Sequence, residues 1–358
     1  MKQFLFATTA IVATTGFAGI AAAQTADAGI TLSGSAEMGI FAIDVDDDDG
    51  DDGDIQFHTD IDVTFTMAGA TDGGLVYGAS IDLDESDGDG SVQRQNGADD
   101  VPFTDDDTFS GGTSPAFAND DQGGEEIFIS GGFGTLTMGD TDGALDWALA
   151  EVGFNATSLN DDHEHAGWNG NSGLDGTFDG QILRYDYTIG DYAIALSGEI
   201  DDDDKIPADL DDTDPILGVG FRGSIDFAGN SVGFGIGYQT GDDGDGGDNE
   251  AYGASVNTTL AGFQVGLTFM NVDDEDDGDD DGYEHYGIGV GYGMGPLALH
   301  ANYGKYDFDG DEDNASGYGL TAGYDLGDDV QLQLGYGNSN GDGGNDREQF
   351  SFGVSMSF

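Results

Sequence analysis

The chain has no cysteine and very little positive charge. Without cysteine it has no disulfide staples, so hydrogen bonds and packing alone must hold the fold together. Seven Lys and Arg residues stand against 73 Asp and Glu residues, a formal net charge of -66 at pH 7. This balance excludes nucleic acid and anionic lipid headgroups as partners, because both repel a polyanion. Cations of the surrounding solution are the partners that such a charge attracts.

Long apolar runs are also lacking beyond the first 23 residues. Residues 1–23 combine Lys2 with the apolar stretch Phe4–Ala22 and end in small residues, the pattern of a secretory signal peptide. An N-terminal membrane helix is the alternative interpretation. No later segment approaches the roughly 18 consecutive apolar residues that a spanning helix needs. We therefore expect an exported chain whose barrel-forming domain is residues 24–358.

What the chain does have is alternation of apolar and polar residues with period two. Between Ile55 and Met67 the odd positions are apolar except for Thr59, and the even positions are polar. Because successive side chains of a strand point to opposite faces, this pattern predicts a strand with one apolar and one polar face. The expected strands are residues 29–43, 55–69, 74–85, 125–131, 135–140, 181–188, 191–200, 215–226, 231–240, 250–260, 263–272, 283–293, 297–306, 316–325, 329–338 and 347–358.

The connections between these strands alternate between short turns and long acidic loops. Short ones include Ala261-Gly262, and long ones include 141–180 and 273–282. An even number of strands, with long loops at one end and one apolar face each, is typical of an up-and-down transmembrane β-barrel. A soluble β-sandwich and an acidic halophilic enzyme are the alternatives. The one-sided loops disfavour the sandwich, and the near absence of acid from the apolar strand faces disfavours the enzyme. The prediction is therefore an all-β, 16-stranded antiparallel barrel in the bacterial outer membrane.

Three segments resemble the alphaproteobacterial general-diffusion porins. They are Leu32–Phe41 (LSGSAEMGIF), Phe65–Ser80 (FTMAGATDGGLVYGAS) and Ile127–Asp140 (IFISGGFGTLTMGD), and the terminal Phe358 is similar to the C-terminal signal of outer-membrane proteins. The resemblance implies a homotrimer of 16-stranded barrels whose third long loop folds inward and narrows the lumen.

The third long loop, residues 141–180, carries both tryptophans, Trp147 and Trp168, and a helix-compatible stretch, Ala144–Val152. The resemblance implies that its acidic residues border the constriction, with basic residues on the wall opposite. The acidic candidates at this end are Asp140, Asp142, Asp146, Glu151, Asp161, Asp162 and Glu164. Strand alternation places three basic residues in the lumen: Arg184, Arg222 and Arg347. With only these three, a strong electric field across the lumen is not expected.

Metal-binding and catalytic motifs are sparse. The run Asp161-Asp162-His163-Glu164-His165 offers imidazole and carboxylate ligands, so His163 and His165 are the candidate ligands of a transition metal. The segment Asp277–Gly282 begins like an EF-hand loop, but Ile288 stands where that loop needs Glu. We expect no cofactor beyond loosely held Ca²⁺ or Mg²⁺ on the acidic runs. No nucleophile elbow or phosphate-cradling loop is present, so we expect no enzyme.

These patterns predict a general-diffusion pore for ions and small hydrophilic solutes, with a preference for cations. The acidic loops further indicate adaptation to a saline environment. Two alternatives remain open. One is a substrate-specific channel, which a saturable solute site would reveal. The other is a structural or adhesive barrel whose acidic loops bind calcium, which absence of conductance would reveal.

Overall fold

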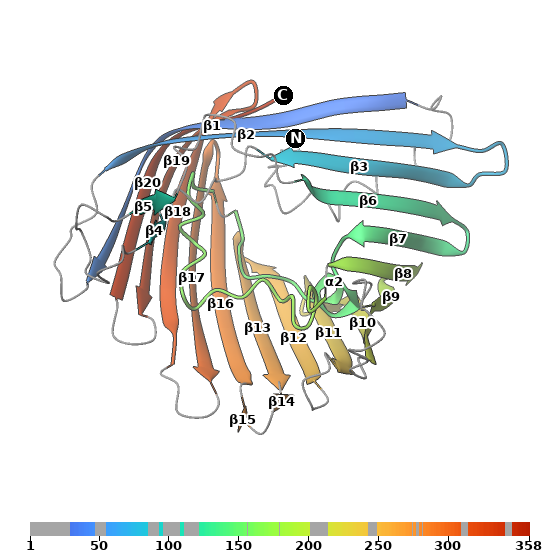
Figure 1. Ribbon diagram of the computed structural model, residues 1–358. Coiled ribbons are helices and arrows are strands. Elements are labelled where there is room, and N and C mark those ends of the chain that lie inside the picture. The colour runs from blue at the N-terminus through green and yellow to red at the C-terminus, as the bar shows by residue number, and fades with distance from the viewer. Residues whose placement is uncertain are drawn as a thin grey trace.

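Sixteen strands form one closed antiparallel barrel in the computed structural model (Figure 1). The strands in order are β1 (Gly29–Asp46), β2 (Gln56–Ala70), β3 (Val76–Asp84), β6 (Gln122–Gly131), β7 (Gly134–Asp140), β8 (Gln181–Ile189), β9 (Tyr192–Glu199), β10 (Asp214–Phe227), β11 (Asn230–Asp242), β12 (Asn249–Leu260), β13 (Phe263–Asp273), β16 (Tyr283–Met294), β17 (Leu297–Phe308), β18 (Ser316–Gly327), β19 (Val330–Asn340) and β20 (Asp346–Ser357). The structure describes residues 29–46, 55–84, 93–95, 108–110, 122–155, 157–178, 180–200, 214–242, 249–273, 275–276, 279–280, 282–308, 314–340 and 346–358.

Each strand pairs with the strands before and after it in the barrel, and β1 pairs with β20 to close the ring. Closure leaves no unpaired sheet edge, which a hydrocarbon environment could not satisfy. At the seam Glu37 of β1 lies opposite Ser355 of β20 on one side and Asp60 of β2 on the other. In this ring order β3 and β13 lie across the lumen from each other.

The two faces of the wall differ as the alternation predicts. Apolar side chains such as Ile127 (67% exposed) and Leu217 (57%) point outward, where a hydrocarbon layer would cover them. Polar side chains such as Gln239 and Ser351 point inward and are fully buried. Because these inward-pointing side chains are buried, another part of the chain must lie against them inside the barrel.

Every strand predicted from the alternation is present, with bounds that differ by at most a few residues. Two short ladders were not predicted, β4 (Gln93–Gln95) with β5 (Thr108–Ser110) and β14 (Glu275–Asp276) with β15 (Asp279–Asp280). The predicted signal peptide, residues 1–23, lies outside the described residues. Among those described, no helix is long and apolar enough to cross a bilayer.

The helix predicted over 144–152 is shorter in the structure. It is α2 (Ala144–Ala148), and Leu149 after it is extended, with φ -83° and ψ 157°. In the last turn of α2 and just after it, backbone groups bond to the wall instead of continuing the helix. The Trp147 carbonyl accepts from Arg222 at 2.6 Å, and the Ala150 N–H donates to the Ser255 hydroxyl at 2.8 Å. Helical propensity therefore yields to tertiary hydrogen bonds.

Candidate functional site

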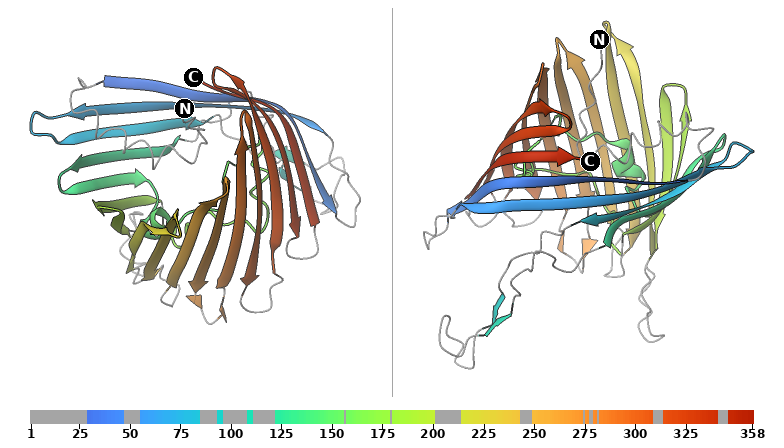
Figure 2. Two further views of the ribbon diagram at one scale, coloured as in Figure 1. Left: turned by 180° about the vertical axis from the view of Figure 1, so that it is seen from behind. Right: turned by 90° about the horizontal axis from the view of Figure 1, so that it is seen from above.

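The segment of residues 141–180, here called L3, lies against the inner face of the barrel. α2 packs against β9, β10 and β11, and the rest of L3 runs toward β19 and β20 and back. Figure 1 and the view from behind in Figure 2 show α2 and the green trace of L3 within the ring of strands. L3 thus covers the inward-facing polar side chains of the wall.

The root of L3 is held by side chains of β9 and β11. The Ser197 hydroxyl accepts the Ala144 N–H at 2.8 Å, and the Gln239 side-chain oxygen accepts the Leu174 N–H at 2.9 Å. The Asp175 carboxylate crosses between the two arms of L3 and accepts the Gly143 N–H at 2.7 Å. These bonds place both arms side by side on the wall.

Glu199, at the end of β9, is a buried carboxylate that serves as an anchor for the returning arm. It accepts three backbone N–H groups, from Gly176 at 3.0 Å, Phe178 at 3.2 Å and Gly180 at 2.9 Å. Hydrogen bonds to an ionised acceptor are about twice as strong as neutral ones. A charge that is only 2% exposed is thereby compensated by backbone dipoles.

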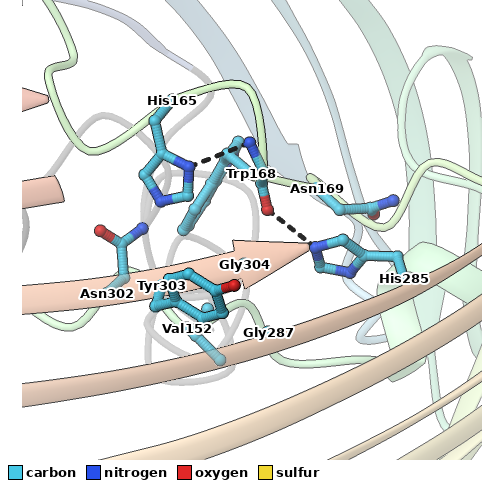
Figure 3. Close-up of a pocket in the computed structure, with 10 residues that line it drawn as sticks. Val152, His165, Trp168, Asn169, His285, Gly287, Asn302, Tyr303 and Gly304 are labelled. Carbon is cyan, nitrogen blue, oxygen red and sulfur yellow. Dashed lines mark hydrogen bonds between the residues drawn. The ribbon is translucent and has the colours of Figure 1, made fainter. Parts of the chain in front are cut away.

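The middle of L3 is bound to β16 and β17 through its backbone carbonyls. His285 Nε2 lies 2.9 Å from the Gly167 carbonyl oxygen, and the Tyr306 hydroxyl donates to the Trp168 carbonyl at 2.8 Å. Figure 3 shows this layer, with the imidazole of His165 bonded to the Gly167 N–H beside Trp168 and Asn302. The wall therefore binds this part of L3 mainly through the backbone groups of L3.

The tip of L3 reaches the seam of the barrel. Leu159 is buried, and a Cβ added to Gly39 of β1 or to Gly353 of β20 would meet its side chain at 2.3 or 2.4 Å. The Ser351 hydroxyl of β20 donates to the Asp162 carboxylate, and the Ser158 hydroxyl accepts the Asp162 N–H at 2.8 Å. Asp162 is fully buried, so it holds the tip in place and does not line the lumen.

Glycines line the inner wall where L3 contacts it. A Cβ on Gly220, Gly235 or Gly289 would lie 1.9 Å from a carbonyl oxygen of L3, far inside van der Waals contact. These glycines alternate with apolar residues along the strands, so their hydrogens face inward. The missing side chains let the L3 backbone approach the sheet closely. This G-x-G alternation is the sequence signal for a loop that lies against the inner wall.

The lumen-facing arginines lie beneath L3 and not across the lumen from it. Arg184 donates to the Asp142 carbonyl, and Arg222 donates to the Trp147 carbonyl while its guanidinium carbon sits 3.8 Å from the centre of the Trp147 ring. Both therefore fix the path of L3. Arg347 is exposed near the loop end of β20. The arrangement implied by the family resemblance, with basic residues facing an acidic loop, is not present at Arg184 and Arg222, because L3 passes directly over them.

The seven predicted acidic residues divide into two groups. Glu151, Asp161 and Glu164 are exposed on the lumen side of L3, and Asp142 and Asp146 are half-buried. Asp140 ends β7 and accepts the Gly124 N–H at 2.9 Å, while Asp162 is bound to the seam. The structure thus brings three of the seven to the free surface of L3.

A second set of carboxylates faces the lumen from the wall. We call the inner face of β1, β2, β3 and β6 the acidic wall, defined by Glu37, Asp60, Asp62, Asp82 and Glu126. Its members are linked to polar neighbours: the Ser35 hydroxyl donates to Asp62 at 2.7 Å, and His58 Nε2 lies 3.6 Å from the Glu37 carboxylate. The alternation placed β2's carboxylates on a polar face, but their relation to L3 depends on the closed ring.

Enclosure inside the barrel alters the acidity of the L3 carboxylates. It raises the pKa of Asp161 to about 7, and the negative charges of Glu164, Glu37, Asp162 and Asp60 add to the effect. It likewise raises the pKa of Glu151 to about 7, assisted by Glu164 and Asp142. The tip of L3 and the acidic wall are therefore close enough to repel each other.

Three metal-ligating groups come together at the tip of L3. One donor atom each from Asp161, His163 and Glu164 lies within 4.8 Å of the others. His165, predicted as the partner of His163, is instead 4% exposed, and its Nδ1 accepts the Gly167 N–H at 3.0 Å. The turn closed by the bond from the Glu164 N–H to the Asp161 carbonyl interrupts the alternation of side chains, so that Asp161 and Glu164 are exposed while His165 is buried against the wall.

Comparisons with known proteins agree with this architecture. The sequence profile described as Gram-negative porin matches residues 7–344. A curated porin of Rhodobacter capsulatus is 33% identical over 189 residues, which are 49% of this chain and 48% of that protein, so the match spans about half of the relative's length. A porin structure refined at 1.8 Å resolution has a TM-score of 0.60 at 24% identity, covering 92% of this chain and all of the other. A mutant of the Rh. blastica porin has a TM-score of 0.59 at 20% identity, with the same coverage.

Proposed function

Because this chain belongs to the Gram-negative porin family, we propose that its barrel is a diffusion channel for ions and small hydrophilic solutes, selective for cations. The protein lies in the bacterial outer membrane, as its family and fold indicate. We also propose, from the family resemblance, that three barrels assemble into a homotrimer. In such a channel the water-filled lumen replaces bulk solvation, and L3 sets the size limit.

The observation that carries the cation preference is the sign of the charge on both sides of the lumen. Glu151, Asp161 and Glu164 lie on the free surface of L3, and the acidic wall faces the same space. The two arginines of the described inner wall that lie near L3 have their charges beneath it, at the Asp142 and Trp147 carbonyls. Carboxylates on both sides concentrate cations and repel anions, because low-dielectric walls focus the field in a narrow space.

The test is the zero-current potential of the purified protein in a planar bilayer under a KCl gradient. We expect a potential of the sign that K⁺ permeation produces, largest at low salt, since the Debye length falls from about 10 Å at 0.1 M to about 3 Å at 1 M. Folded protein without conductance would contradict the channel, and a potential near zero would contradict the selectivity alone. A conductance that saturates with one solute would favour a substrate-specific channel.

The selectivity is expected to depend on pH around neutrality. Enclosure raises the pKa of Glu151 to about 7, and the charges of Glu164 and Asp142 act in the same direction. A carboxyl group with a raised pKa is neutral below that value and negative above it. We therefore expect the permeability ratio of K⁺ to Cl⁻ to rise as the pH is raised from about 5 to about 9. Exposed carboxylates with ordinary pKa values would be fully ionised over most of this range, so a flat profile would contradict the assignment.

A further inference from the structure

The tip of L3 presents a ligand set that a diffusion channel does not require. Its backbone makes a tight turn, in which the Glu164 N–H donates to the Asp161 carbonyl at 2.7 Å. This turn brings the carboxylates of Asp161 and Glu164 to the same side, with the imidazole of His163 between them in sequence. One donor atom of each residue lies within 4.8 Å of the others, before any adjustment to a bound ion.

The position of His163 is fixed by its neighbours. The His163 backbone carbonyl accepts a hydrogen bond from the side-chain amide of Asn302 at 2.9 Å, and the His163 ring stands edge-on to Trp168 with 5.0 Å between the ring centres. Nδ1 has no hydrogen-bond partner in the described part of the chain, and Nε2 lies 3.7 Å from the nearest Glu164 oxygen. Among the described residues, the imidazole therefore has no hydrogen bond that a metal ion would have to break.

We propose that Asp161, His163 and Glu164 form a binding site for a divalent transition-metal ion of the Zn²⁺ and Ni²⁺ class on the lumen side of L3. One imidazole with two carboxylates suits these ions better than Ca²⁺ or Mg²⁺, which take oxygen ligands only. Three protein ligands leave the remaining positions to water, as in open zinc sites. A bound ion would also neutralise the negative charges of Asp161 and Glu164, which the carboxylates of the acidic wall repel.

Trp168 provides a direct readout, because it touches His163 and is one of only two tryptophans. Ni²⁺ added alone to the detergent-solubilised full chain is expected to quench the Trp168 share of the fluorescence in a saturable way. His163→Gln should weaken this binding by about tenfold or more, because losing even a hydrogen-bond partner of a metal ligand typically costs about 10–100-fold in affinity. His165→Gln is the matched control, because that imidazole is turned into the wall two residues away.

Three results would overturn the site. One is quenching that His163→Gln leaves unchanged, and another is quenching that His165→Gln weakens equally. The third is displacement of Ni²⁺ by equimolar Ca²⁺, which would show binding to carboxylates without selectivity. Glu164→Gln gives a second test of the ligand set if His163→Gln fails to fold. Because fluorescence in detergent needs no ion flow, failure of this site and failure of the channel are distinguishable.

Discussion

Replacing Glu37 and Asp60 of the acidic wall together with Asp161 of L3 by their amides is expected to reduce cation selectivity severalfold. These three carboxylates lie within electrostatic reach of one another where the tip of L3 meets β1 and β2. A charge about 4 Å from a passing ion contributes about 1 kcal/mol even in water, and about 1.4 kcal/mol is a tenfold change. The zero-current potential under a KCl gradient measures the effect, which should fade at high salt.

The matched control removes the same number of charges at the short-turn end of the barrel, away from the tip of L3. Asp72, Asp328 and Asp329 are exposed in the short turns, and the last two have φ of 53° and 61°, which asparagine tolerates. Their replacement by asparagine should leave selectivity unchanged. Equal losses in the two triple variants would mean that net charge, and not the constriction, sets the preference.

A leucine in place of Gly289 is expected to displace L3 and change the conductance. A Cβ at this position would lie 1.9 Å from the Val152 carbonyl oxygen and 2.9 Å from the Val152 Cβ. Overpacking of this kind typically destabilises a fold by about 1–3 kcal/mol. Since β16 is fixed in the barrel, the loop is the part that must move, toward the lumen. We expect a smaller single-channel conductance, more open-channel noise and a lower melting temperature.

Gly293 of the same strand provides the control. It faces the same side, four residues nearer the short turn, and a Cβ there would meet nothing within 4 Å. Gly293→Leu adds the same apolar volume to the inner wall without touching L3. If both variants conduct alike and melt alike, then L3 does not rest on the wall in the way the structure describes.

The alternation of apolar and polar residues predicts the barrel because it is a local property. Within each strand it shows which face is turned toward water. The number, order and bounds of the strands follow from it, and so does the inward direction of Arg184 and Arg222. What these arginines contact does not follow, because Asp142 and Trp147 reach them only through the path of L3. The likeness to porins predicted an inward third loop but gave the arginines a facing position that this chain does not use.

The acidic wall is a second case in which the sequence predicts the face of a side chain but not its contacts. Asp60 and Asp62 stand on the polar face of an alternating strand, so their exposure to the lumen is readable from the sequence. The closeness of Asp60 to Asp161 requires that β1 lies between β2 and β20 after closure and that Leu159 enters the gap between Gly39 and Gly353. Neither condition has a local signature, since the residues concerned are far apart in the chain.

The position of the L3 tip has a consequence for assembly. Ser351 and Asp162 are 189 residues apart, and their hydrogen bond ties L3 to the last strand, which pairs with the first. L3 therefore lies against the inside of the seam, and we expect its docking and the pairing of β20 with β1 to be coupled during folding. Contacts between residues so distant in the chain form late, because loop closure opposes them until other strands are in place. L3, which we propose narrows the lumen, thus also helps to hold the last strand of the barrel in place.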